Sequence, residues 1–181
     1  MIIKTPILSV REIQQSDIEL ITSYWLTAAD NYLQAMGVDL NKMPAREQWI
    51  NILSEQLAQP YNEKKSYCTI WLKDGKPTGH CNVNKIVFAK EAYLHLHIWD
   101  AEIRKKGFGT SFLKISIPYF FINLQLKKIY CEPYSRNASP NKTLPKLGFR
   151  FIKEHITIPG MLNFEQRVQL WELDDESFIR T

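Results

Sequence analysis

The chain has 181 residues, of which 45% are hydrophobic and 23% are charged, a balance typical of a globular protein with one sizeable core. Its net charge of +4 is too small to indicate a nucleic-acid-binding protein, although it suits an anionic small ligand. No apolar run approaches the roughly 18 residues of a membrane-spanning helix, so we expect one domain over residues 1–181 with no membrane partner.

One strand and two helices are predicted in the first third of the chain. Alternating apolar residues over 7–13 favour a strand. Residues 14–26 are typical of a helix, with Ser16 as its N-cap and Glu19 three residues later in a capping-box arrangement. A second helix is predicted over 41–59. Its buried stripe is expected to consist of Trp49, Ile50, Leu53 and Leu57.

A hairpin and a further strand are predicted next. Strand-like runs at 66–72 and 78–88 flank Asp74-Gly75, which is a strong signal for a tight turn. Residues 92–100 alternate strictly between two sets of side chains. One face of that strand would carry Tyr93, His95, His97 and Trp99, and the other Leu94, Leu96 and Ile98.

The remaining elements complete a mixed α and β pattern. An apolar helix is predicted from residue 110 to about 126, and a short strand over 127–133. A loop and a short helix follow, and Gly148 is a natural C-cap for that helix. The last two strands are predicted over 150–158 and 164–173.

Cysteine and histidine usage predicts neither a disulfide framework nor a metal site. Cys68, Cys81 and Cys131 have no C-x-x-C spacing, which favours reduced thiols in a cytoplasmic protein, and the first residues contain no signal-peptide pattern. His95 and His97 form H-x-H on a strand, but no third ligand stands at a helpful spacing, so no metal is expected.

The stretch RKKGFGTSFL, residues 104–113, lies between a predicted strand and a predicted helix. Helix N-termini expose backbone N–H groups, and glycines let a phosphate approach them without interference from a Cβ. A glycine-rich tight turn with no ligand would look similar. The nucleotide-binding patterns fit poorly, because no lysine follows Gly109 and Phe112 stands where the dinucleotide fingerprint has its third glycine.

Two separated signatures give the chain a family resemblance. The first is R-x-x-G-x-G, formed by Arg104, Gly107 and Gly109. The second is an asparagine loop leading into a short helix that ends K-x-G-F, formed by Asn137, Lys146, Gly148 and Phe149. With this spacing, the chain resembles the GNAT acetyltransferase superfamily, specifically the branch that includes the ribosomal-protein N-terminal acetyltransferases. The resemblance covers about 67–173, while residues 1–62 match mainly in element order.

The resemblance implies an α+β fold with a twisted, mixed, mostly antiparallel sheet and flanking helices. Two central parallel strands, 93–99 and 128–132, would splay apart in a V and hold acetyl-CoA as cosubstrate. The backbone of His97, Ile98 and Trp99 would pair with the pantetheine arm, and Asn137 would bind the same arm. The pyrophosphate loop would comprise Arg104, Lys105, Lys106, Gly107, Phe108, Gly109 and Thr110.

The resemblance also implies direct attack of a primary amine on the thioester, in a ternary complex. Glu132 is the candidate base, although a carboxylate there could instead be ion-paired to a neighbouring lysine or arginine. His95 could orient water or substrate, or could be a structural histidine. The tyrosine that many members use as general acid is replaced by Leu144, so the acid is unassigned.

Three functions are weighed from the sequence. The first is an N-acetyltransferase that acts on a small-molecule or peptide amine, as a monomer or homodimer. The second is an acyl-CoA-binding module of the same fold with little or no catalysis, suggested by Leu144. The third is a nucleotide-binding regulator, for which ATP would compete with acetyl-CoA. The acceptor could be a protein N-terminus, a polyamine, an amino sugar or an antibiotic, because function resides in the site and not in the fold.

Overall fold

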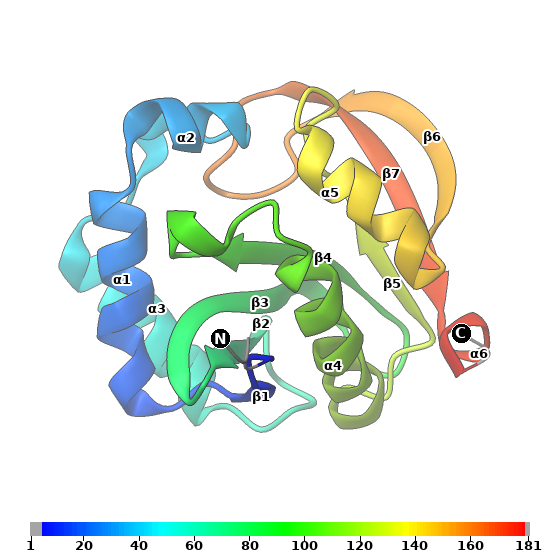
Figure 1. Ribbon diagram of the computed structural model, residues 1–181, viewed down its shortest axis with the longest axis horizontal. Helices are drawn as coiled ribbons and strands as arrows, with labels where there is room; N and C mark the ends of the chain where they lie inside the picture. Colours follow the sequence, from blue (N-terminus) through cyan, green and yellow to red (C-terminus); the bar gives the residue numbers. More distant parts are fainter. Residues whose placement is uncertain (1–4, 180–181) are drawn as a thin grey trace.

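One mixed sheet of seven strands, in the order β1-β2-β3-β4-β5-β7-β6, organises residues 5–179, which the computed structural model describes (Figure 1). Neighbouring strands are antiparallel except β4 and β5, which run parallel. This confirms the predicted mixed, mostly antiparallel sheet. The strands are β1 Leu8–Glu12, β2 Ser66–Lys73, β3 Lys76–Val87, β4 Glu91–Ile98, β5 Lys128–Cys131, β6 Arg150–Thr157 and β7 Gln166–Asp174.

The parallel pair opens soon after it begins. β4 and β5 are paired only from Glu91 opposite Lys128 to Tyr93 opposite Tyr130. Beyond that point β4 stays paired with β3 as far as Ile98, but it has lost its partner on the other side. The central parallel strands therefore diverge in a V, as the resemblance implied.

Six helices and four short 3-10 turns, η1 to η4, flank the sheet in the described residues. In Figure 1, α1 and α3 lie to one side of the sheet, while α4 and α5 lie in front of it. The helices are α1 Ile18–Thr27, α2 Asp30–Ala35, α3 Arg46–Ala58, α4 Phe108–Asn123, α5 Ala138–Thr143 and α6 Asp175–Ile179. No helix in this part of the chain is long and apolar enough to cross a bilayer.

The sheet has a separate apolar core on each face. The larger core joins the inner face of α4, including Phe112, to buried side chains of β2 through β5 and β7. The smaller core joins α1, α2 and α3 to β2, with Trp25 and Trp49 stacked at 5.6 Å between ring centroids. Strand alternation in β4 is confirmed, because Leu94 belongs to the first core and Trp99 packs against the second.

The start of α1 corrects one prediction. Ser16 is not the N-cap: the turn η1 spans Gln15–Asp17, and the reciprocal capping contacts are made by Gln14 and Asp17. The Asp17 carboxylate accepts a hydrogen bond from the Gln14 N–H at 2.8 Å and forms an ion pair with Arg11 of β1 at 2.5 Å. Asp17 therefore binds the helix start to the sheet, which a serine at position 16 does not do.

The second predicted helix is also shorter than expected. A 3-10 turn η2 occupies Leu40–Lys42, and α3 begins only at Arg46. Of the predicted stripe on α3, Trp49 is buried, whereas the other three side chains are partly exposed. The separate helix α2 was not predicted.

Candidate active site

The loop between β4 and α4 has the backbone conformation of an anion site. The short turn η3, Ala101–Ile103, leads into it. Lys105 and Gly107 adopt left-handed conformations, with φ of 60° and 83°, and Gly107 is the N-cap of α4. When left-handed residues alternate with residues of negative φ, successive N–H groups turn toward one point. In addition, the first N–H groups of a helix have no intrahelical partner. The loop therefore presents donors and the positive end of α4 to a ligand.

Gly109 has a conformation that other residues can adopt. A Cβ built there would lie 3.7 Å from Cδ1 of Ile98, which is an ordinary van der Waals contact. Packing within the protein does not require a glycine at this position. The prediction that a ligand approaches this backbone closely would account for the glycine.

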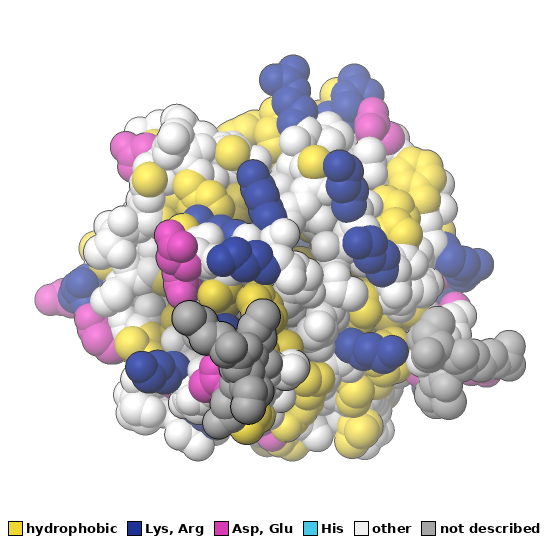
Figure 2. All heavy atoms as spheres, in the orientation of Figure 1, with side chains coloured by type: hydrophobic (Ala, Val, Ile, Leu, Met, Phe, Trp, Pro, Cys, Tyr) yellow, Lys and Arg dark blue, Asp and Glu magenta, His cyan; other side chains and the backbone are white. Residues whose placement is uncertain are grey.

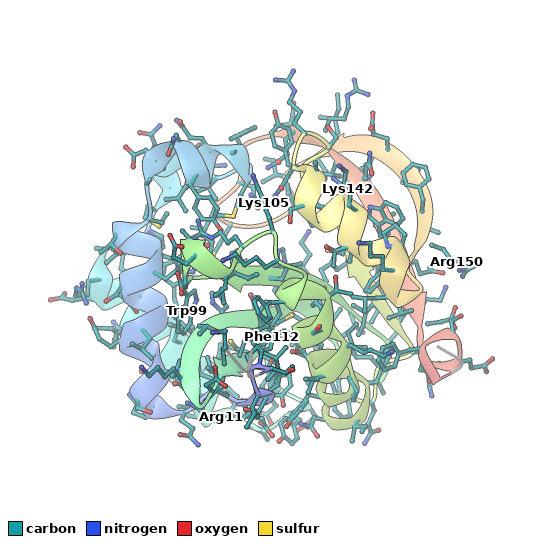
Figure 3. All side chains as sticks on the ribbon, viewed as in Figure 1. Arg11, Trp99, Lys105, Phe112, Lys142 and Arg150 are labelled. Carbon is teal, nitrogen blue, oxygen red and sulfur yellow. The ribbon has the colours of Figure 1, made fainter. Side chains whose placement is uncertain are left out.

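Exposed cations surround this loop. Lys105 and Lys106 are exposed, and Figure 2 shows several lysine and arginine side chains on the face that carries the start of α4 and α5. Lys105 projects from the loop and Lys142 from α5 (Figure 3). A positive potential here favours a polyanionic ligand such as a pyrophosphate.

Arg104 has a bracing role that sequence reasoning missed. Its guanidinium donates hydrogen bonds to the carbonyls of Ile98 and Trp99, both at 3.0 Å. It also lies over the ring of Tyr32 in α2, 3.8 Å from the centroid. The side chain thus connects the end of β4, the loop and α2. Because the guanidinium makes these contacts within the protein, the prediction that Arg104 binds the cofactor depends on the position of Arg104 in the loop.

The three predicted pantetheine-binding residues, at the end of β4 and directly after it, differ in how open their backbone is. The Trp99 N–H donates to the carbonyl of Thr78 at 2.9 Å, and its carbonyl accepts from Arg104. The Ile98 carbonyl also accepts from Arg104. Trp99 is therefore already paired, and His97 lies opposite His80 of β3, so of the three residues it is Ile98 whose N–H faces away from β3 and is open to a ligand.

Asn137 begins α5 with an uncommitted side chain. It occupies the N-cap position, but its amide makes no capping hydrogen bond. The loop around it is held instead by Asn141, whose amide donates to the carbonyls of Tyr134 and Asn137 at 3.1 and 2.9 Å. Leu144, which stands where many family members have a tyrosine, is fully buried in the larger core.

Histidines and aromatic rings form a connected group on the face of β4 that packs against α1 and α2. Trp99 donates from Nε1 to Nδ1 of His80 at 2.7 Å, and the rings of His80 and His97 stack at 4.7 Å. Nδ1 of His97 lies 3.3 Å from the hydroxyl of Tyr24, which lies 3.4 Å from that of Tyr32. His97 thus has a structural role in addition to its backbone position.

His95 differs from these histidines because its Nε2 is buried without a hydrogen-bond partner. Burial and the nearby ammonium of Lys85 lower the pKa of His95 to about 4. Burial likewise lowers the pKa of His80 to about 3 and that of His97 well below its usual value. All three imidazoles are therefore neutral near pH 7, and His95 is a weak base with an unused ring nitrogen.

These depressed pKa values predict an acid-sensitive fold. In the unfolded chain the histidines regain ordinary pKa values near 6.5, so below that pH the unfolded state binds more protons than the folded state. We expect the melting temperature to fall as the pH is lowered from about 6.5 toward 4, where His95 itself begins to titrate. Asp174, whose pKa is also lowered, would reduce the stability of the fold further only around and below pH 3.8, its ordinary pKa. A melting temperature that stays constant between pH 7 and 5 would contradict the buried, neutral histidines.

Glu132 follows β5 on the face that carries His95. Its Oε1 lies 3.2 Å from Nε2 of His155, its Oε2 lies 3.9 Å from Nζ of Lys85, and its side chain is only 8% exposed. Burial raises the pKa of Tyr93, and the nearby Glu132 carboxylate raises it further, which places the carboxylate beside β4. The ion-paired alternative considered from the sequence is therefore present in the structure, and it leaves the carboxylate at the opening of the V.

Lys85 reaches this carboxylate through an irregularity in β3. The pairing of β3 with β4 shifts register between Asn84 and Val87, and Lys85 has a φ of 48°. Its ammonium lies over the ring of Tyr93, 4.7 Å from the centroid. Bulges of this kind often redirect a side chain beside a functional site. Neither Lys85 nor His155 was predicted, because their proximity to Glu132 depends on contacts between distant segments.

No group of three or more histidine, cysteine, aspartate or glutamate side chains in the described part of the chain could hold a metal ion. The three cysteines are all free and buried. The candidate site consists of the V between β4 and β5, the loop between β4 and α4, and Glu132 with its neighbours Lys85 and His155.

Comparisons with known proteins fit this geometry. The family model for the acetyltransferase (GNAT) domain matches residues 8–150. Spermidine N-acetyltransferase from Vibrio cholerae, solved with CoA and spermine, has a TM-score of 0.77 at 14% identity, over 95% of this chain and 98% of that one. RimL, a ribosomal L7/L12 alpha-N-protein acetyltransferase solved with coenzyme A, has a TM-score of 0.76 at 12% identity, over 97% of each chain.

A third structure, the ribosomal-protein-S5-alanine acetyltransferase from Vibrio fischeri, has a TM-score of 0.73 at 18% identity, over 97% of this chain and 99% of that one. No curated protein sequence matches the chain. At these identities the structural likeness establishes the fold, and it leaves the amine acceptor open.

Proposed function

The chain belongs to the GNAT acetyltransferase family and is an acetyl-CoA-dependent N-acetyltransferase, and we propose that it acetylates a primary amine by direct attack in a ternary complex. The observation that carries this proposal is the V between β4 and β5 with an anion loop next to it. The V offers unpaired strand backbone, and the loop offers the N–H groups and the positive charge that a pyrophosphate needs.

The residues present suit acetyl-CoA. The N–H groups of Lys105 through Gly109 would hold the pyrophosphate, with Thr110 beside them, and the free amide of Asn137 would bind the pantetheine side. The Ile98 N–H, which faces away from β3, would pair with the pantetheine arm or be directed at the thioester carbonyl. Such a pre-positioned donor stabilises negative charge on that oxygen as the amine attacks.

Glu132 is proposed to accept the proton of the attacking amine. Its contacts with Lys85 and His155 hold the carboxylate in place beside β4, within reach of an amine that enters the V. Glu132 takes one proton from the substrate ammonium group, directly or through water, and the neutral amine nitrogen then bonds to the carbonyl carbon as the carbon–sulfur bond breaks. Since Leu144 is buried in the core, solvent or the protonated amine would supply a proton to the departing thiolate.

The acceptor is proposed to be a small-molecule or peptide amine that enters from the face carrying His95 and Glu132. The relatives named above act on spermidine and on ribosomal proteins, and both acceptor types are consistent with the open end of the V. The free, buried cysteines fit a cytoplasmic protein, which could act as a monomer or homodimer.

A second candidate function is an acyl-CoA-binding module with little catalysis. The observation that favours it is Leu144, whose complete burial leaves no hydroxyl at the place of the family tyrosine. Both candidates bind coenzyme A, so binding does not separate them. Thiol release from acetyl-CoA, measured against a panel of primary amines, does: release with any one amine supports the enzyme, and none with all of them supports the module.

We expect acetyl-CoA to protect the fold against heat. A ligand at 100 times its dissociation constant adds about 2.7 kcal/mol of apparent stability, because it binds only the folded state. Free coenzyme A should protect as well, since it shares the pyrophosphate and pantetheine contacts, whereas ATP should protect much less. The measurement is the melting temperature with each ligand at millimolar concentration. No shift with either acetyl-CoA or coenzyme A would contradict binding in the V.

A further inference from the structure

We propose that His155 is the positioning residue for Glu132 in acetyl transfer, a role that rests on the proposed function. His155 lies on β6, at the edge of the sheet, whereas Glu132 directly follows β5. β7 lies between these two strands, so the contact crosses a strand. The imidazole therefore reaches back over β7 toward the opening of the V.

The contact between His155 and Glu132 is a hydrogen bond to one of the two carboxylate oxygens. Nε2 of His155 lies 3.2 Å from Oε1 of Glu132, and the two side chains are 26% and 8% exposed. The other ring nitrogen, Nδ1, is buried and has no partner among the described residues. A neutral ring protonated on Nε2 donates to Glu132 and leaves only a lone pair unpartnered, whereas a proton on Nδ1 would be a buried donor without an acceptor.

This arrangement divides the two oxygens of Glu132 between two tasks. Oε1 is occupied by His155, which fixes the rotation of the carboxylate. Oε2 faces the ammonium of Lys85 at the longer distance of 3.9 Å, and the Lys85 side chain is 45% exposed. Lys85 can therefore yield to an incoming amine, so Oε2 is the oxygen left to take the proton. Holding a base in one orientation in this way is what a supporting hydrogen bond does at a catalytic site.

The charged and titratable groups around the pair come from several elements. Lys85 of β3 and both Tyr93 and His95 of β4 lie on the same side as Glu132. On β6 the neighbour Glu154 pairs instead with Arg167 of β7, at 3.2 Å, where both side chains are largely exposed. His155 is thus the group of β6 that acts on Glu132, and Glu154 offers a matched control on the same strand.

The test compares His155→Leu, His155→Gln and the control Glu154→Gln. We expect His155→Leu to lower kcat about 10-fold or more at unchanged KM for acetyl-CoA, because it removes a hydrogen bond to a charged group. His155→Gln should stay within about threefold of the wild type, because its amide N–H can donate to the same oxygen. Glu154→Gln should change neither quantity.

Two outcomes would overturn the role of His155. One is a His155→Leu variant with the kcat of Glu154→Gln, and the other is a His155→Gln variant that is as slow as His155→Leu. A wild-type protein that binds acetyl-CoA but releases no thiol with any amine would instead refute the proposed function. Nitrogen NMR of the His155 ring still tests the geometry in that case: an Nε2–H tautomer in the wild type that is lost or averaged in Glu132→Ala, which removes the acceptor, supports the contact, and the Nδ1–H tautomer in the wild type refutes it.

Discussion

Replacing Glu132 by glutamine is expected to lower the turnover of acetyl transfer about 100-fold or more while leaving the affinity for acetyl-CoA unchanged. Glutamine has nearly the same shape, and its carbonyl oxygen can still accept a hydrogen bond from Nε2 of His155. The amide cannot take a proton from the amine, so the loss falls on the chemical step. Initial rates of thiol release at saturating acetyl-CoA, together with cofactor titration, measure the two quantities separately.

His95→Ala provides the comparison for this prediction. His95 has an unused Nε2 on the same face, but a pKa lowered to about 4 makes its imidazole a weak base at neutral pH. Its replacement should therefore slow turnover less than Glu132→Gln does. A larger loss in His95→Ala would assign the base to His95. If neither variant is slowed beyond about threefold, solvent takes the proton and the site works by positioning an amine that is already neutral.

The acidic limb of the pH–rate profile offers a second readout of the same prediction. In the wild type that limb reports the base and the amine that it deprotonates. In Glu132→Gln only the amine and solvent are left to titrate, so the limb should change its midpoint or slope. An identical limb in both proteins would mean that Glu132 does not exchange a proton with the substrate.

Local sequence rules were sufficient for most of the sheet. Alternation in β4 separated Leu94 from His95 correctly, because the side chains of a strand project to opposite faces. The hairpin between β2 and β3 followed from Asp74-Gly75, and both residues have the positive φ that such a turn requires, 51° and 78°. These features depend on neighbours in sequence, so they can be predicted without the rest of the fold.

The N-terminal helices were predicted less well because distant contacts determine them. Asp17 is preferred over Ser16 at the start of α1 because it also pairs with Arg11 of β1. The segment after α2 is fastened to the β6–β7 loop, since Gly37 accepts hydrogen bonds from Asn163 and Gln166 at 2.9 Å. No periodic pattern in residues 30–43 encodes those partners.

The candidate site likewise has features that local sequence predicts and features that depend on distant contacts. The glycine motif located the loop before α4, because glycine at a strand-to-helix junction has a direct backbone meaning. The bracing of β4 by Arg104, and the approach of Lys85 and His155 to Glu132, were not predicted. They depend on a register shift in β3 and on the order of β5, β7 and β6 in the sheet, which a single sequence does not reveal.

The other large effect is expected at Gly109, where valine should raise the KM for acetyl-CoA about 10- to 100-fold with kcat within about threefold. A bulky side chain at this position would keep a phosphate from the N–H groups at the start of α4, and a lost hydrogen bond to a charged group costs roughly 1.5–3 kcal/mol. The fold should tolerate the change, because the first added carbon lies 3.7 Å from Cδ1 of Ile98 and the backbone is helical. KM from thiol-release rates and the melting temperature without ligand measure the two effects.

Ser111→Val is the matched control for Gly109→Val, because it places the same β-branched side chain in the same turn of α4 at an exposed position. Any cost of valine to the helix itself should then appear in both variants, while the loss of cofactor affinity should appear only at Gly109. Gly109→Ala should give a smaller rise in KM than valine, because steric exclusion grows with the size of the side chain. If a folded Gly109→Val protein keeps the wild-type KM, no phosphate approaches this backbone. The stretch from Arg104 to Leu113 then only turns the chain, and the cosubstrate has to be held elsewhere along the V.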